Sequence, residues 1–450
     1  MKKFIAALLL AATLQAPRCF AESAKNFCGT TEEMLDAEYW IKRAKDAGAV
    51  LLDADGAARL SAEIRKTPGT YCTDILEYAE MLPREAVLKK MAPFSKRPGS
   101  PRFIGSEPVG EDFWRRVEEN ADAESVEETT IVRFAAAARN AEIKAYPCGE
   151  PLYGSAGDLL FDMNAESTVK IWEPLAALHE SKDGKYYFVE TPGCSGWISK
   201  DDVALTDKRT LREIFSGGFY VVTASRAFSD IRSSEPEKGR GEFLMGTRLP
   251  AADVDEEDGV SSLFSRCFLV PQRGEDGSLK ITTERLPLSA GLSRGFPPCT
   301  QANVIRQAFK TLGERYGWGG SFSSRDCSAF VRDLYLTFGV ELPRSSSAQA
   351  RVPGHIDASK MSAAEKEKLL ASAPAGTILQ MPGHVMLLLG TVKGRPSAIH
   401  SVYALGPSGS GGAEGRRTIN CVAVTDMEMT RKDGSRVIES IANVVPLNAR

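Results

Sequence analysis

The chain has 450 residues, of which 43% are hydrophobic and 26% charged, and a net charge of −3. This composition is typical of a folded globular protein, and the length implies several domains because single cores rarely grow past roughly 250–300 residues. The mild acidity argues against electrostatic binding to nucleic acid.

The N-terminal residues have the pattern of a signal peptide. Lys2 and Lys3 precede the apolar run 4–14, and Ala21 ends a short segment suited to cleavage. No later stretch reaches the roughly 18 apolar residues of a membrane-spanning helix. We therefore expect residues 1–21 to be removed and the mature chain to be exported to the periplasm or secreted.

Residues 22–125 are expected to form an N-terminal helical domain. Between residues 40 and 82, apolar residues recur at intervals of three and four, which is the period of an amphipathic helix. Proline and glycine interrupt this pattern between Pro98 and Gly105.

From about residue 126 the pattern changes to short strands and frequent turns. Asp183-Gly184 is a hairpin signal, and an alternating strand follows it at Tyr186. These features predict one β-rich domain over residues 126–207. A second, weaker β-rich segment is predicted over residues 208–290.

The segment after residue 290 contains a cysteine at the start of a predicted helix. Asp326 is a good N-cap, Cys327 follows it, and Gly339 ends the apolar pattern. The first turn of a helix favours a thiolate, the form of cysteine that attacks carbonyl groups. Gly317, Gly319 and Gly320 should let the backbone pack closely beneath this helix.

Two histidines follow on predicted strands. His384 and His400 flank a turn near Lys393 to Pro396, so an antiparallel hairpin is expected. Their separation of 16 residues places both rings on one sheet face if the loop is odd-numbered, or if an even-numbered loop is accompanied by one bulge. One imidazole can then accept the thiol proton while the other orients it.

Other interpretations of these residues are structural. Cys327 can be a buried thiol of the core, and either histidine can be a hydrogen-bonded core residue. His355 fits an exposed loop, and His179 lies in the β-rich region far from the helix. No metal-binding motif of the CxxC or HExxH type occurs, so we expect neither a metal nor a cofactor.

The chain has nine cysteines, and cleavage after Ala21 would leave eight. Cys327 must stay free to react, which leaves an odd number for pairing. In an oxidising compartment we expect a disulfide between Cys28 and Cys72.

The motifs YGWGG, DCS, LPRSS, PGHV and AIHS occur in this order after residue 315. Together they resemble the NlpC/P60 cysteine peptidases, which cleave peptides of the bacterial cell wall, and the likeness covers residues 291–450. The region 126–207 resembles a bacterial SH3 (SH3b) domain. The resemblance implies an α+β multidomain fold, with a papain-like catalytic domain preceded by two SH3-like β-barrels and a helical N-terminal segment.

By this resemblance Cys327 is the nucleophile, His384 the general base and His400 the orienting residue. The Tyr316 hydroxyl would lie near the oxyanion position. Asp326 and Ser328 would help to bind the free amino group of the substrate, so Asp326 has two candidate roles, helix cap and substrate ligand.

The domain order is similar to that of γ-D-glutamyl-diamino acid endopeptidases, in which the first SH3 domain narrows the cleft to short peptides with a free N-terminal L-alanine. Asp162 and the turn from Gly193 to Gly196 are candidates for that wall. At Cys194 relatives often have an aromatic residue, which puts the capping contact in doubt.

The implied partners are cell-wall peptides, and a monomer is expected. Two alternatives are an amidase or acyltransferase on the same scaffold, and a wall-binding protein without catalysis.

Overall fold

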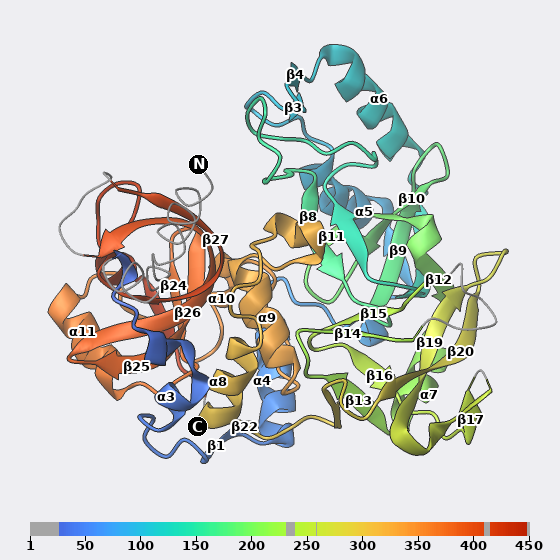
Figure 1. Cartoon of the computed structure of the whole chain (residues 1–450). Helices are drawn as coiled ribbons and strands as arrows, with labels where there is room; N and C mark the ends of the chain where they lie inside the picture. The colour runs from blue at the N-terminus through green and yellow to red at the C-terminus, as the bar shows by residue number, and fades with distance from the viewer. Residues whose placement is uncertain (1–26, 231–238, 258, 409–414, 448–450) are drawn as a thin grey trace, which may run out of the picture.

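The computed structural model describes residues 27–230, 239–257, 259–408 and 415–447. The predicted signal peptide lies outside these residues. Within the described residues, no helix is both long and apolar enough to span a bilayer. Figure 1 shows a red and orange C-terminal lobe beside a green and yellow β-rich lobe, with helix α9 (Cys327–Leu336) between them.

The C-terminal lobe combines helices with one antiparallel sheet. The sheet has the order β23-β29-β24-β25-β26-β27, and β28 pairs with β26. The strands are β23 (Ile356–Asp357), β24 (Ile378–Met381), β25 (His384–Val392), β26 (Arg395–Ser408), β27 (Arg417–Asp426), β28 (Met429–Thr430) and β29 (Asn443–Val445). The helices are α8 (Gln301–Phe309), α9, α10 (Ser346–Gln349), α11 (Ala363–Ser372) and α12 (Val437–Ser440).

Helix α9 packs its apolar side against this sheet. Phe330, Val331, Leu334 and Phe338 are buried in one core with residues of β25 and β26. The helix ends near Gly339, whose φ of 79° is easily reached only by glycine. The predicted helix and its stop are both present.

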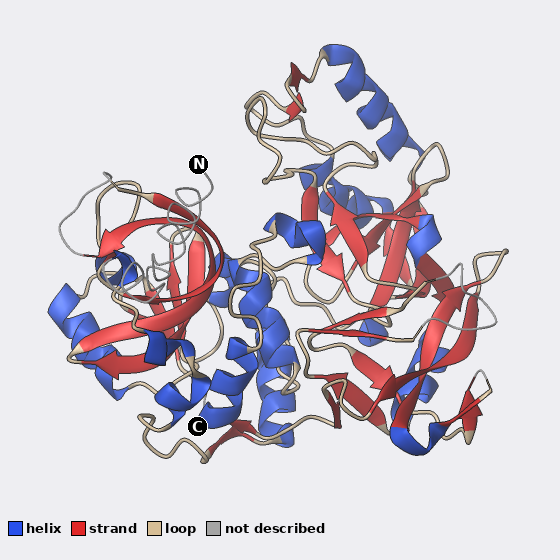
Figure 2. Ribbon diagram, in the orientation of Figure 1, coloured by secondary structure: helices blue, strands red, loops and turns tan. Residues whose placement is uncertain are grey.

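The first β-rich region forms a sheet separate from that of the C-terminal lobe (Figure 2). Its strand order is β12-β6-β9-β10-β11-β7-β8. Its strands are β6 (Arg133–Ala137), β7 (Ala141–Lys144), β8 (Ala165–Val169), β9 (Pro174–Glu180), β10 (Tyr186–Glu190), β11 (Ser195–Ser199) and β12 (Val203–Thr206). The predicted hairpin is present because β9 and β10 pair antiparallel around Asp183 and Gly184. Trp197 is fully buried against Phe188.

The second β-rich region is a set of small sheets. Strand β13 lies between β16 and β21, and the other strands form the hairpins β14–β15, β17–β18 and β19–β20. The bounds are α7 (Lys208–Ser216), β13 (Phe219–Val222), β14 (Arg226–Phe228), β15 (Glu242–Leu244), β16 (Arg248–Pro250), β17 (Glu256–Glu257), β18 (Val260–Ser261), β19 (Ser265–Arg273), β20 (Leu279–Pro287) and β21 (Leu292–Arg294). That this region is a second SH3 domain stays a prediction.

The N-terminal segment is mixed in structure and is divided between two cores. Its elements, with the strand that follows it, include β1 (Val50–Leu52), β2 (Met81–Pro83), β3 (Phe103–Ile104), β4 (Glu107–Pro108), β5 (Thr129–Ile131), α3 (Ala37–Ile41), α4 (Ala54–Lys66), α5 (Arg84–Met91) and α6 (Glu111–Ala121). Trp40 and Ile64 are buried in the core around α9, and β1 pairs with β22 (Cys299–Thr300). Val87 and Met91 instead pack with Trp197 of the first β-rich sheet. The segment therefore joins two lobes.

The predicted disulfide between Cys28 and Cys72 is wrong. Cys72 carries a free thiol, and its Sγ lies 3.8 Å from the Thr70 carbonyl oxygen. Cys72 packs against the α9 core, whereas Cys28 packs against a second cluster around β24 and β25. Spacing along the chain could not reveal that these cysteines belong to different clusters.

Candidate active site

The candidate nucleophile is the first residue of α9. The side chain of Asp326 caps this helix by accepting a hydrogen bond from the Ala329 backbone N–H at 2.8 Å. Burial raises the pKa of Cys327 to about 12, and the charge of Asp326 adds to this shift. The backbone amides of Val385 and Ser328 act in the opposite direction. The expectation that the helix start favours a thiolate is therefore outweighed, and the resting thiol holds its proton.

The two candidate histidines lie on one face of an antiparallel hairpin. Strands β25 and β26 are joined by Lys393 and Gly394, which have φ values of 51° and 81°. This two-residue loop is even-numbered, and the pairing contains a register shift between Leu388 and Gly390. The bulge is what keeps both rings on the same face.

The rings form a hydrogen-bonded chain. His384 Nε2 lies 2.7 Å from His400 Nδ1, and His400 Nε2 lies 3.0 Å from Thr425 Oγ1. Burial lowers the pKa of His384 to about 4 and that of His400 well below its usual value. Both rings are therefore neutral at physiological pH. Thr425, on β27, was not found from the sequence because no local motif marks it.

Asp326 is also the centre of a buried polar cluster. Its carboxylate accepts hydrogen bonds from both terminal nitrogens of Arg344, from Ser328 Oγ and from the Gly319 backbone N–H. Burial alone would raise the pKa of Asp326, but the charge of Arg344 and these donors lower it. Asp326 is thus a cap and an ion-pair partner. Its role as a substrate ligand, like that of Ser328, stays a prediction.

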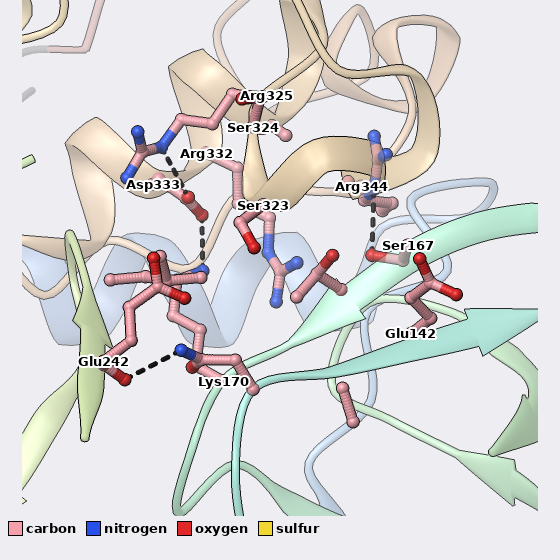
Figure 3. Close-up of a pocket in the computed structure, with 16 residues that line it drawn as sticks. Glu142, Ser167, Lys170, Glu242, Ser323, Ser324, Arg325, Arg332, Asp333 and Arg344 are labelled. Carbon is pink, nitrogen blue, oxygen red and sulfur yellow. Dashed lines mark hydrogen bonds and ion pairs between the residues drawn. The ribbon is translucent and has the colours of Figure 1, made fainter. Parts of the chain in front are cut away.

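Arg344 connects this cluster to the first β-rich sheet. Its Nε donates a hydrogen bond to Ser167 Oγ of β8 at 2.9 Å, as Figure 3 shows. Arg344 also lies near Gly193, where an added Cβ would come within 3.5 Å of the Arg344 Cβ. The first residue of the predicted turn therefore lies against Arg344, whereas Gly196 at its end approaches Ile143 and Lys144.

The interface also contains a cavity of about 120 Å³ lined by charged side chains (Figure 3). Lys170 of the first β-rich region forms a buried ion pair with Asp333 of α9, and Arg325 pairs with the same carboxylate at 2.9 Å. Glu242 and Leu244 of the second β-rich region also line this cavity, so three regions meet at it.

The glycine-rich loop before α9 approaches the β-rich sheet. A Cβ on Gly319 would collide with the Ala165 carbonyl oxygen, and one on Gly320 would collide with Thr168 Oγ1. Only Gly317 packs within its own loop, against Ser321 and Ser324. Gly319 and Gly320 thus allow close approach to β8, while the Gly319 backbone N–H also bonds Asp326, the cap of α9.

Aromatic rings line the region beside this loop. Phe161 contacts Tyr316, Trp318 and Tyr403, with ring centroids 6.1, 5.7 and 4.6 Å apart. Burial raises the pKa of Tyr316 strongly, and the charges of Cys327 and Asp326 raise it further. The Tyr316 hydroxyl therefore keeps its proton and can donate a hydrogen bond. Sequence analysis missed Phe161 and Tyr403, since neither belongs to a motif.

Asp162 follows Phe161, but its carboxylate accepts hydrogen bonds within its own loop. Its Oδ1 accepts hydrogen bonds from the Leu152 and Asn164 backbone N–H groups, each at 2.8 Å. Burial raises the pKa of Asp162. Its predicted contact with substrate remains a prediction.

The other two histidines form hydrogen bonds with backbone carbonyl oxygens outside this site. His355 Nδ1 lies 3.2 Å from the Val352 carbonyl oxygen, and His179 Nε2 lies 3.1 Å from that of Ala121. Across the described part of the chain, no group of three or more histidine, cysteine or acidic residues is arranged to hold a metal ion.

Comparison with known proteins identifies two domains. Residues 313–403 match the NlpC/P60 family, and residues 151–199 match the SH3 domain of the SH3b1 type. No curated protein matches the chain.

Among solved structures, an NlpC/P60 endopeptidase from Photobacterium damselae subsp. piscicida is 16% identical, with a TM-score of 0.71 over 92% of this chain and 96% of its own. An NlpC/P60 family protein from Bacillus cereus is 19% identical, with a TM-score of 0.44 over 63% and 82% of the two chains. The first likeness extends the shared fold over nearly the whole chain, and the predicted α+β multidomain class is confirmed.

Proposed function

We propose that the chain, in which residues 313–403 match the NlpC/P60 family and residues 151–199 match an SH3b domain, is an exported cysteine peptidase of bacterial cell-wall peptides. The proposed bond is the one between γ-D-glutamate and the diamino acid. The observation that carries this proposal is the hydrogen-bonded chain from His384 through His400 to Thr425, on the strands that pack against α9. Such a chain orients an imidazole as a general base.

The proton positions follow from the hydrogen bonds. When His400 Nε2–H donates to Thr425 Oγ1, His400 Nδ1 is an acceptor and takes the Nε2–H of His384. His384 Nδ1 then carries a free lone pair. The basic nitrogen of His384 is thus Nδ1, which does not face His400.

The resting protonation states of Cys327 and His384 determine the order of the proton transfers. Because the thiol keeps its proton and His384 is neutral, proton transfer to His384 accompanies attack of Cys327 Sγ on the D-glutamyl side-chain carbonyl. The imidazolium then donates this proton to the departing amine, which leaves a thioester. His384 next takes a proton from water, and the resulting hydroxide attacks the thioester carbonyl and breaks the C–S bond. The acid is released, and the Cys327 thiolate takes the proton back from His384.

The SH3b domain is proposed to restrict the substrate to short peptides with a free N-terminal L-alanine. This proposal is supported by the contact of Phe161 with Tyr316 and by the approach of the Gly319–Gly320 loop to β8. A fixed wall at this position would exclude longer stems whose alanine nitrogen is acylated. Tyr316, Asp326, Ser328 and Asp162 are the proposed substrate contacts.

The proposal is tested with L-Ala-γ-D-Glu-diaminopimelate and its N-acetylated form, with products identified by mass spectrometry. We expect release of diaminopimelate from the free-amine peptide only. Cys327→Ala should abolish release, and Cys421→Ala, which changes a half-buried cysteine on β27, should retain it. Cleavage of both peptides would refute the restriction, and cleavage of neither would refute the proposed activity.

A further inference from the structure

A second, larger cavity lies where the N-terminal segment, both β-rich regions and α9 meet. It has a volume of about 340 Å³, within the range of small-molecule sites. Trp172, Phe215, Leu211 and Ile171 supply apolar walls, and Leu336 at the end of α9 supplies another. Cys327 is at the other end of this ten-residue helix, about 14 Å away at 1.5 Å per residue. The cavity is therefore separate from the candidate active site.

Two polar atoms at this cavity have no hydrogen-bond partner among the described residues. They are Thr247 Oγ1 and Arg248 Nε, on consecutive residues that both line the cavity. Thr247 is only 2% exposed, and it lines the cavity. Unpaired buried polar atoms are uncommon in native proteins because each costs free energy. A ligand acceptor would satisfy both donors.

Arg248 also differs from the other cations that line the cavity. Arg65 pairs with Glu341, Arg332 with Glu173 and Arg212 with Glu77. Lys170 pairs with Asp333.

Within the described part of the chain, Arg248 has no ion pair. Its guanidinium carbon lies 4.6 Å from the ring centroid of Phe219 and 4.9 Å from that of Phe215. Burial lowers the pKa of Arg248, and the charge of Glu341, which pairs with Arg65, offsets this only in part.

We propose that this cavity binds a small organic anion whose charged group meets Arg248 and Thr247 and whose apolar body lies against Trp172 and Phe215. The guanidinium would donate to the anionic oxygens, and the Thr247 hydroxyl would supply a further donor. The aromatic walls would take the apolar part out of water. This inference does not rest on the proposed peptidase activity.

The test uses 8-anilinonaphthalene-1-sulfonate as the anionic probe and N-phenyl-1-naphthylamine as its uncharged counterpart. Both are titrated into the folded full-length protein by fluorescence and calorimetry. We expect one anilinonaphthalenesulfonate site per chain. Arg248→Met should weaken this probe at least tenfold while changing the uncharged probe less than twofold. Thr247→Val should weaken the sulfonate about threefold, the effect of one modest hydrogen bond.

Arg294→Met is the matched control, because Arg294 is an exposed arginine on β21 of the same small sheet. It should leave both affinities unchanged. Cys72, which lines the cavity, reports the location of the probe: bound sulfonate should slow its modification by methyl methanethiosulfonate, with Cys421 unaffected.

Failure of the sulfonate to bind would overturn the proposal, as would equal binding to Arg248→Met. If that variant does not fold, Thr247→Val and the protection of Cys72 decide the question. Unchanged affinity or unprotected Cys72 would then refute the site.

Discussion

The two β-rich regions contact α9 in different ways, although Ser225 of the second region also bonds Arg325, just before the helix. Ser167 of the SH3b domain reaches the start of the helix through Arg344, which pairs with Asp326 beside Cys327. Gly246 of the second region packs on the end of the helix, where an added Cβ would lie 2.7 Å from Leu336 Cβ. The first contact is polar and lies next to the proposed chemistry, whereas the second is a close contact remote from it. The comparison indicates that one region shapes the site and the other supports its helix.

The largest effect is expected beside the start of α9, where the proposed chemistry takes place. His384→Gln should lower kcat/KM by about 10²–10⁴-fold because the general base is lost. The thermal midpoint should change little, since a polar side chain of similar length remains. His355→Gln is the control, because His355 lies in a loop and bonds only the Val352 carbonyl oxygen. More than a tenth of the wild-type rate in His384→Gln would contradict the assigned role.

The pH dependence of kcat/KM tests the burial of His384 at the proposed site. Because burial lowers the pKa of His384 to about 4, its neutral form persists as the pH falls through 6.5. The acid limb of kcat/KM should therefore have its midpoint near pH 4. At pH 4.5 the rate should be roughly a hundredfold above that of an enzyme whose base titrates at 6.5. Steady-state kinetics in constant-ionic-strength buffers measures this limb, and a midpoint near 6.5 would show that the site is hydrated in solution.

A matched pair of glycine substitutions tests the two contacts directly. Gly320 and Gly246 have φ values of 95° and 81°, so alanine is strained at both positions. Gly320→Ala should displace β8 from the catalytic loop and lower kcat/KM about tenfold. Gly246→Ala should lower the thermal midpoint and leave kcat/KM within twofold. Equal kinetic losses in the two variants would remove the proposed division of roles.

The smallest effect is expected from one hydrogen bond in the polar contact. Ser167→Ala removes the acceptor of Arg344 Nε but leaves the ion pair with Asp326. The loss should be about 1 kcal/mol of unfolding free energy. Urea denaturation measures it, with Ser125→Ala as an exposed control. A loss as small as that of the control would mean that Ser167 does not support Arg344.

The candidate site was predictable where its signals are local. Asp326 as the cap, Cys327 in the first turn and the hairpin around Gly394 all follow from short patterns. The bulge between Leu388 and Gly390 was one of two ways to bring His384 and His400 together, and sequence alone could not choose between them.

Long-range contacts were missed because no short pattern records them. The Arg344–Ser167 hydrogen bond joins residues 177 positions apart, and Thr425 lies 25 positions after His400. The helix-start argument for a thiolate failed for a related reason, since burial of Cys327 depends on how separate elements pack. The division of the N-terminal helices between two cores was likewise not predictable, because their partners lie far along the chain.

That division has a consequence for biosynthesis. Trp40 and Ile64 complete a core whose other members include Val304, Phe330 and Ile399. A ribosome that adds roughly 5–20 residues per second needs about 12 to 50 s to pass from residue 67 to residue 300. During this interval the residues that pack against these early helices have not been made, so the core around α9 can assemble only late in synthesis. The proposed nucleophile, Cys327, therefore takes its packed position only after most of the polypeptide has been made.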